Sequence, residues 1–249
     1  NKNVEGLILL NHGIFTFGES AKQSYDRMIR YVSIVEDFIT KSNKNIKSKK
    51  NIKVKNFQNI PLLIRKTYFE INGNKWIVKL NNSKKDLEFS LLENLKIMFS
   101  KGPVTPDHVI RIKAKPLFIK YKDINQINKS ILQYSKEYIK YFHKYKSYVP
   151  SSVISDTLPR IIIIEGFGYF SIGRNVKEEK ISLDIFNSMK HSIVDSFKIG
   201  KFKSISNKEI FKMEYWPLER AKLTSNKRKI AEGQILIITG GAGTIGMAT

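Results

Sequence analysis

A histidine between an asparagine and a glycine has the surroundings in this chain that best suit metal chemistry. Asn11, His12 and Gly13 follow the apolar run 6–10 directly and precede a second, largely apolar run at 14–17. A neutral imidazole can coordinate zinc through one nitrogen while an acceptor holds the other nitrogen, and a neighbouring glycine lets the backbone turn sharply. The pattern therefore indicates His12 as a metal ligand on a turn between two strands.

A weaker copy of this segment occurs downstream. An offset of 155 positions places Gly13 on Gly168, Phe15 on Phe170, Thr16 on Ser171, Gly18 on Gly173 and Lys22 on Lys177. Both copies read as strand, glycine-containing bend, short strand, glycine and helix, so we predict a duplicated unit. His12 corresponds to Phe167, which cannot coordinate a metal, so the second unit is expected to keep the scaffold without the metal.

A glycine series near residue 240 forms a second candidate site. The apolar run 235–238 reads as a strand, and Gly241, Gly243 and Gly246 then satisfy the pattern G-x-G-x-x-G. Glycines allow a tight turn from a strand to a helix, so that a pyrophosphate can meet backbone N–H groups at the helix N-terminus. We expect that helix to begin near Thr244.

Four segments, taken in order, resemble known families. Residues 9–18 are similar to the zinc-histidine segment of the class II aldolase/adducin family, and residues 239–246 to the nucleotide loop of short-chain dehydrogenases, with Thr244 in place of the usual middle glycine. Residues 102–111 and 213–223 lie between them. This order resembles the bifunctional aldolase/short-chain dehydrogenases of the rhamnulose-1-phosphate aldolase/lactaldehyde dehydrogenase type.

The resemblance implies zinc-dependent retro-aldol cleavage of a ketose phosphate, coupled to NAD- or NADP-dependent oxidoreduction of an aldehyde or alcohol. In the family, the histidine that matches His12 shares the zinc with an upstream His-x-His pair, which this chain lacks. The dehydrogenase pair Tyr-x-x-x-Lys is also absent, so no catalytic residue is assigned. We expect an internal fragment that is inactive alone. The implied cofactor contacts are Gly240, Gly243, Thr244, Ile245 and Gly246.

Two other classes of function remain open. The net charge is +22, and residues 41–55 contain seven lysines and no acid, which could indicate a nucleic-acid-binding protein. Lysine is abundant throughout, however, and a solvated basic linker at 41–58 explains the run better. The family resemblance implies the other alternative, a non-catalytic, adducin-like interaction module.

Composition limits the remaining possibilities. The chain has no cysteine, so disulfides and thiolate metal sites are excluded. It contains no apolar run of membrane-spanning length. We expect a cytoplasmic enzyme whose partners are a sugar-phosphate substrate and a nicotinamide cofactor, with homo-oligomerisation open.

These patterns predict an α/β fold of duplicated class II aldolase-like α/β/α lobes, followed by the first strand and glycine loop of a Rossmann-type domain. The expected domains are a first-lobe remnant at 1–40, the basic linker at 41–58, a degenerate second lobe at 59–213, a linker at 214–233 and the dehydrogenase start at 234–249. Strands are expected at 7–10, 14–17, 76–80, 161–164, 169–172 and 235–238, and helices at 20–40, 60–71, 86–99, 123–145, 176–199 and 206–213, with a further helix starting at 105–107.

The other three histidines receive weaker assignments. His108 follows Thr105 and Pro106, which resemble a helix start, so we favour a packing or capping role over a substrate-phosphate role. His143 and His191 lie on expected helices without partners at metal-binding spacing, and we treat both as structural or exposed.

Overall fold

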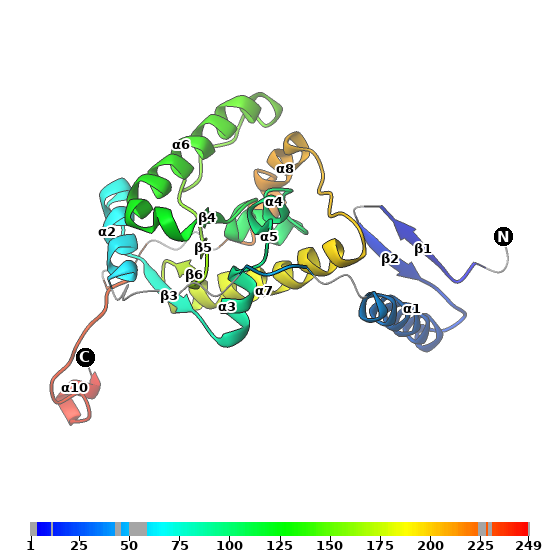
Figure 1. Ribbon diagram of the computed structural model, residues 1–249, viewed down its shortest axis with the longest axis horizontal. Coiled ribbons are helices and arrows are strands. Elements are labelled where there is room, and N and C mark those ends of the chain that lie inside the picture. Colours follow the sequence, from blue (N-terminus) through cyan, green and yellow to red (C-terminus); the bar gives the residue numbers. More distant parts are fainter. Residues whose placement is uncertain are drawn as a thin grey trace.

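A four-stranded mixed sheet forms the centre of the protein (Figure 1). The computed structural model describes residues 4–10, 12–42, 46–49, 59–223, 228 and 231–248. The strand order is β3-β6-β5-β4, with β3 at Ile77–Asn81, β4 at Leu117–Ile119, β5 at Ile161–Ile164 and β6 at Gly168–Gly173. β6 runs antiparallel to both β3 and β5, whereas β4 runs parallel to β5.

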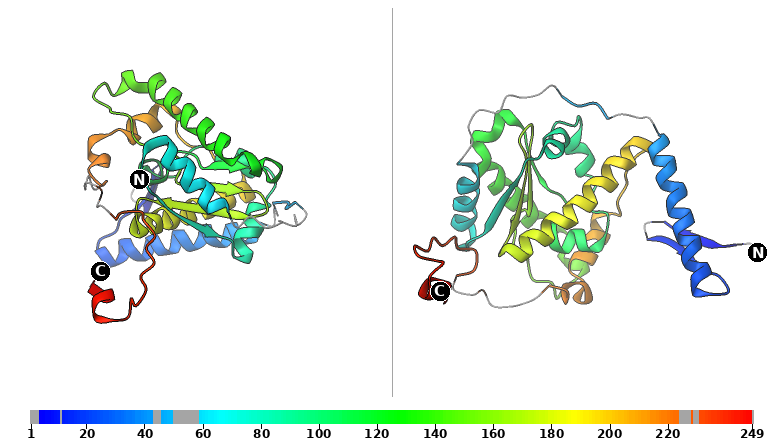
Figure 2. Two further views of the ribbon diagram at one scale, coloured as in Figure 1. Left: turned by 90° about the vertical axis from the view of Figure 1, so that its left-hand side faces the viewer. Right: turned by 90° about the horizontal axis from the view of Figure 1, so that it is seen from below.

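Helices cover both faces of this sheet, which gives three layers (Figure 2). Ile162 and Ile164 face the core beneath α2 (Ile60–Asn72) and α6 (Ile127–Tyr145), whereas Ile161 and Ile163 face the core beneath α7 (Val176–Ile199). All four isoleucines are fully buried. A continuous apolar run is the pattern expected of a strand that is buried on both faces.

Shorter helices complete this body. They are α3 (Lys84–Ser90), α4 (Leu95–Phe99), α5 (Pro106–Ile112), α8 (Asn207–Glu214), α9 (Pro217–Arg220) and the 3-10 helices η1 (Tyr121–Gln126) and η2 (Lys146–Tyr148). The last helix, α10 (Thr244–Ala248), lies apart from this body (Figure 1) and has no buried residue. The predicted single helix over 86–99 is wrong. Asn94, at φ 60°, separates α3 from α4, and a left-handed residue interrupts the helical hydrogen-bond ladder.

A smaller unit of β1 (Gly6–Leu9), β2 (Gly13–Thr16) and α1 (Ala21–Lys41) projects from this body (Figures 1 and 2). β1 and β2 form an antiparallel hairpin, and α1 has no buried residue. The unit meets the body where α1 contacts α7, and there Ser42 Oγ donates a hydrogen bond to the carbonyl oxygen of Lys198 at 3.3 Å.

The expected linker is described only at residues 46–49. Ile46 packs against the α7-side core, Ser48 forms an antiparallel bridge with Leu92, and Lys49 N donates to Leu91 O at 2.8 Å. This part of the basic segment therefore contacts the body, and residues 47–49 stay exposed. Residues 43–45 and 50–58 of the expected linker lie outside the described residues.

The predicted strand at 235–238 is wrong. Residues 234–238 have no regular secondary structure, and Ile235, Leu236, Ile237 and Ile238 are all exposed. A strand needs a hydrogen-bonded neighbour, and the sheets of the described residues contain no partner for this run. The helix that follows, α10, does begin at Thr244 as expected. No helix within the described residues is long and apolar enough to span a membrane.

Candidate functional site

His12 lies on the turn of the β1–β2 hairpin, and its backbone N–H closes that turn on the carbonyl oxygen of Leu9 at 3.1 Å. Phe167 closes the β5–β6 turn in the same way, donating to the carbonyl oxygen of Ile164 at 3.0 Å. His12 and Phe167 therefore occupy the same position in two turns of the same form.

The pairing registers of the two hairpins also correspond. β1–β2 pairs Gly6 with Thr16, Leu7 with Phe15, Ile8 with Ile14 and Leu9 with Gly13, and β5–β6 pairs Ile161 with Ser171, Ile162 with Phe170, Ile163 with Tyr169 and Ile164 with Gly168. Every pair is shifted by the same 155 positions. The expected succession of strand, bend, strand and helix is confirmed in both segments.

The N-caps of the helices that follow correspond as well. The Ser20 side chain accepts a hydrogen bond from Gln23 N at 3.2 Å, and the Asn175 side chain accepts one from Glu178 N at 3.0 Å. Serine and asparagine are preferred N-caps because their side-chain oxygens satisfy a free backbone N–H of the first turn.

His12 borders an open cavity of about 480 Å³, as expected for a residue at a concave site rather than in the core. The imidazole is exposed and stacks on Phe15 with 5.4 Å between ring centroids. Across the cavity lie residues 103–106, part of the segment that the family resemblance singled out. Asn11, also expected here, lies outside the described residues, and Gly13 is not among the lining residues.

The described residues do not complete a zinc centre at His12. Among them, no group of three or more His, Cys, Asp or Glu side chains lies close enough to hold a metal ion. A catalytic zinc site needs three protein donors and an open position. His12 alone therefore does not form such a centre within the described residues.

His108 has the capping role that the sequence favoured. Its Nδ1 accepts a hydrogen bond from the Thr105 backbone N–H at 3.2 Å and lies 2.6 Å from Thr105 Oγ1, at the start of α5. The side chain is buried, and this burial lowers its pKa despite the opposing charge of Asp107. His108 is thus held neutral at the helix start.

The glycine loop has the tight geometry that its sequence predicts. Gly240 has φ 71°, and Gly243 N donates to Gly240 O at 2.8 Å. A Cβ at Gly246 would lie 2.4 Å from Gly240 O, so a side chain there would collide with the turn. Thr244 and Ile245 open the exposed α10. Without the strand at 235–238, however, the loop is not anchored to the edge of a sheet.

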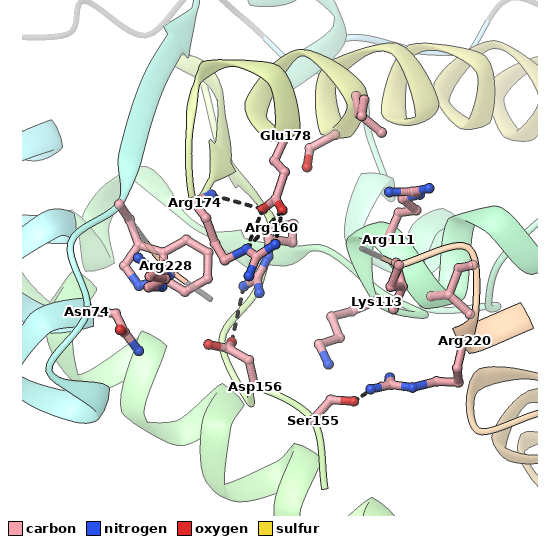
Figure 3. A pocket seen from close by; sticks show the side chains of 15 residues that line it. Asn74, Arg111, Lys113, Ser155, Asp156, Arg160, Arg174, Glu178, Arg220 and Arg228 are labelled. Carbon is pink, nitrogen blue, oxygen red and sulfur yellow. Dashed lines mark hydrogen bonds and ion pairs between the residues drawn. The ribbon is translucent and has the colours of Figure 1, made fainter. Parts of the chain in front are cut away.

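A cationic cavity that the sequence reasoning missed lies between α5, α7 and α9 (Figure 3). Its volume is about 350 Å³. Six cationic side chains and two carboxylates line it, namely Arg111, Lys113, Arg160, Arg174, Arg220, Arg228, Asp156 and Glu178. We call it the arginine cavity.

Both carboxylates of the arginine cavity are paired with arginines. Arg160 Nη1 lies 3.1 Å from Asp156 Oδ1, and Arg174 Nε donates to Glu178 Oε1 and Oε2 at 2.8 and 3.0 Å. Burial opposes the ionisation of Asp156 and Glu178, but the neighbouring guanidinium groups lower the pKa of each carboxyl. The two acids are therefore ionised at neutral pH and already compensated.

The other three arginines of the cavity donate to uncharged oxygens. Arg220 Nη1 donates to Ser155 Oγ at 2.6 Å, Arg111 Nη2 to Lys222 O at 2.9 Å and Arg228 Nη1 to Lys75 O at 2.7 Å. Within the part of the chain that the structure describes, none of the three has an ion pair with a carboxylate.

Lys113 is held in the cavity wall under strain. It caps the C-terminus of α5 with φ 73°, a backbone region that non-glycine residues rarely adopt. The side chain is only 9% exposed, and Nζ lies 3.6 Å from Glu214 Oε1 and 3.9 Å from the centre of the Tyr138 ring. Burial lowers the pKa of Lys113 to about 8, although Glu214 opposes the shift.

One compositional signal could have pointed to this cavity. The chain has only eight arginines against 36 lysines, yet five of the eight line a single cavity. Arginine and lysine are not interchangeable where a planar, bidentate donor is needed. Because lysine is so common in this chain, an arginine indicates a position where the paired donors of a guanidinium group are needed.

The structure can now be set beside known proteins. Residues 55–223 match the family described as aldolase class II, second domain. The whole chain aligns at 27% identity, over 272 positions, with the uncharacterized oxidoreductase YuxG of Bacillus subtilis (strain 168), and spans 38% of that protein. No solved structure matches the chain. Since the family match covers more than half of the sequence, the chain belongs to the class II aldolase family, with residues 55–223 as the second domain.

Proposed function

We propose that this chain is part of a bifunctional enzyme that cleaves a ketose phosphate by a retro-aldol reaction and interconverts an aldehyde and an alcohol with NAD or NADP. Membership of the class II aldolase family supports the first activity. The printed name of the Bacillus subtilis relative, an oxidoreductase, supports the second. That relative is much longer than this chain, so both activities are assigned to the intact protein.

The observation that carries the aldolase half is the shared register of the two hairpin–helix units. The unit of β5, β6 and α7 lies inside the matched second domain. Its equivalent 155 residues upstream therefore belongs to a related lobe, in which His12 replaces Phe167. This supports a duplicated aldolase scaffold with the metal-binding histidine in the first copy.

His12 is suited to hold one coordination position. The turn hydrogen bond from its N–H to Leu9 O fixes the backbone, and stacking on Phe15 restrains the imidazole beside an open cavity. Zinc, when bound, would supply Lewis-acid stabilisation of negative charge on oxygen. The intact protein must provide the other donors.

The dehydrogenase half rests on the glycine loop. Gly240 and Gly246 approach too closely for a side chain at Gly246, which is the steric requirement of a loop that lets backbone N–H groups reach a pyrophosphate. In the intact protein, NAD or NADP would contact Gly240, Gly243, Thr244, Ile245 and Gly246.

An adducin-like interaction module is the second candidate, favoured by the apolar surface of α1. Tyr25, Ile34 and Phe38 are 65%, 56% and 62% exposed, and a helix with such exposed apolar side chains suits contact with another protein surface.

Zinc content and retro-aldol cleavage of the intact protein test the aldolase half. We expect His12→Ala to lose both zinc and cleavage of a panel of ketose phosphates without a change in fold. The matched control, His191→Gln, replaces an exposed histidine on α7 and should retain both. An intact protein that neither binds zinc nor cleaves any ketose phosphate would favour the interaction module.

The cofactor loop is tested separately. Gly246→Val in the intact protein should raise the dissociation constant for the nicotinamide cofactor at least about tenfold, equivalent to roughly 1.4 kcal/mol, and leave aldol cleavage unchanged. Unchanged cofactor affinity would show that the glycines form a turn without a binding role.

A further inference from the structure

The arginine cavity is separate from the proposed zinc site. Adjacent residues of α5 face the two spaces, since Val109 lines the His12 cavity and Ile110 lines the arginine cavity. We propose that the arginine cavity binds the phosphate group of a small phosphate monoester. This second ligand site, within the second aldolase domain, does not rest on the proposed zinc or dehydrogenase activities.

The charge of the lining is the first argument. Asp156 and Glu178 are each matched by one arginine, and Glu214 lies beside Lys113. Arg111, Arg220 and Arg228 then remain without an ion pair among the described residues. Cationic side chains gathered around one cavity repel one another, and a dianionic phosphate would offset that repulsion.

The geometry of the donors is the second argument. Arginine presents a planar fork that forms paired hydrogen bonds to phosphate oxygens. The guanidinium groups of Arg160 and Arg228 lie 4.2 and 4.7 Å from the centre of the Trp76 ring, and such stacking fixes their orientation. Figure 3 shows the Lys113 ammonium group entering the space between Asp156 and Arg220.

A buried donor without a partner is the third argument. Trp76 lines the cavity, is 1% exposed, and its Nε1 has no hydrogen-bond partner among the described residues. The indole nitrogen can only donate, and a buried donor without an acceptor costs free energy. An oxygen of a bound phosphate is an acceptor that could satisfy it.

Backbone strain at Lys113 is the fourth argument. Its φ of 73° is of the kind that costs about 1–3 kcal/mol and persists where the surrounding structure imposes it, often at ligand sites. The strained backbone carries an ammonium group into a space already rich in positive charge. Within the fold the ammonium group is offset by Glu214 and the Tyr138 ring, and a bound anion would give it a further partner of opposite charge.

The size of the cavity favours a small ligand. Its volume of about 350 Å³ is near the lower end of the range of ligand sites. The Ser155 hydroxyl and the Asn74 amide also line it and could contact ligand hydroxyl groups. These features favour a short phosphorylated polyol over a dinucleotide.

Calorimetric titration of the full chain with glycerol 3-phosphate, inorganic phosphate, glycerol and NAD tests the proposal. We expect saturable binding of glycerol 3-phosphate, weaker binding of inorganic phosphate and none of glycerol. Arg220→Gln and Arg111→Gln should each raise the dissociation constant for glycerol 3-phosphate at least about tenfold, or roughly 1.4 kcal/mol. Arg220→Lys should have an intermediate effect, because it keeps the charge and loses the fork.

The control is Lys140→Gln, which removes an exposed cation of α6 that has no ion pair among the described residues and should leave the affinity within about twofold, below 0.5 kcal/mol. Arg111 donates to one exposed backbone carbonyl, so its variant should fold even if the Arg220 variant does not. The proposal fails if no saturable phosphate binding occurs, or if Lys140→Gln weakens binding as much as Arg111→Gln. It also fails if NAD binds in the cavity more tightly than glycerol 3-phosphate.

Discussion

The β1–β2 and β5–β6 hairpins share one register and one form of turn, but they lie in opposite surroundings. Every residue of β5 and β6 is buried, whereas β1 and β2 contain no buried residue. Ile163 is 0% exposed and its equivalent, Ile8, is 78% exposed. The same local structure thus serves once as the centre of a core and once as a projecting unit.

The neighbours of each hairpin cause this difference. β3 pairs with β6 and β4 pairs with β5, so no edge of the second hairpin is left open. Within the described residues the first hairpin has no third strand. The turn hydrogen bond and the helix N-cap therefore stabilise the unit in both places. Pairing with further strands determines whether its apolar side chains form a core.

Matched substitutions at Ile163 and Ile8 should give the largest contrast. Ile163→Ala leaves a cavity in a closed core and should lower the free energy of unfolding by about 2–5 kcal/mol. Ile8→Ala at the exposed position should lower it by less than about 0.5 kcal/mol. Urea unfolding followed by tryptophan fluorescence measures both. Equal losses would mean that the two hairpins are equally packed.

The hairpin glycines should give the next contrast. Gly168 and Gly13 have φ values of 105° and 149°, so alanine at either position costs about 1–3 kcal/mol of strain. At Gly168 a Cβ would also lie 2.3 Å from Asn81 O, whereas at Gly13 it meets nothing within 4 Å. Gly168→Ala should therefore destabilise the chain more than Gly13→Ala, by the same unfolding measurement. The reverse order would contradict the close approach of β3 to β6.

A pH dependence should arise from Lys113, beside the second unit. The Lys113 pKa of about 8 lies below the usual 10.5, so from pH 8 to 10 this lysine binds more protons in the unfolded chain than in the folded chain. Lys113 should then contribute a rise in stability with pH across this window, by about 2 kcal/mol. The charged and titratable groups around Lys113 are Glu214, Tyr138, Asp156, Arg160 and Arg220.

Lys113→Met provides the check on this prediction. It removes the titrating group while Glu214 keeps its hydrogen bond from Tyr138 at 2.6 Å, so the change in stability from pH 8 to 10 should be less positive by about 2 kcal/mol in the variant. The same change in both proteins would show that Lys113 does not contribute to the pH dependence.

Helix caps should give the smallest contrast. Asn175→Ala removes the cap of α7, which lies on the core, and should cost about 1 kcal/mol in global unfolding. Ser20→Ala removes an equivalent bond from α1, which has no buried residue, so it should reduce helicity by circular dichroism without moving the unfolding midpoint. A shift of that midpoint with Ser20→Ala would show that α1 unfolds together with the core.

Local features could be predicted from the sequence because neighbouring residues determine them. The bounds of α7, Val176–Ile199, match the expected helix, and both hairpins follow from apolar runs on either side of a glycine-containing bend. Residues 235–238 show the opposite case, since their apolar run predicts a strand but a strand also needs partners that the described residues do not supply. The left-handed Asn94 likewise divides a segment whose apolar pattern alone predicts one helix.

The candidate sites also differ in whether neighbouring residues or the tertiary fold determine them. His12 and the glycine loop are contiguous motifs and could be found by inspection. The arginine cavity is lined by Arg111, Arg160 and Arg220, which come from separate parts of the chain. No local sequence pattern therefore predicts it. Only the tertiary fold brings these side chains together.

Hydrogen exchange of the backbone amides in the two hairpins is the measurement that most directly tests whether one local unit occurs in two environments. Resolved by NMR, the protected amides of β1–β2 and β5–β6 should alternate in the same order, offset by 155 positions. Protection in β5–β6 should approach that of global unfolding, whereas β1–β2 should exchange through local opening, faster by at least about two orders of magnitude, or roughly 2.7 kcal/mol. A different alternation of protected amides would contradict the shared register, and equal protection would contradict the difference in burial.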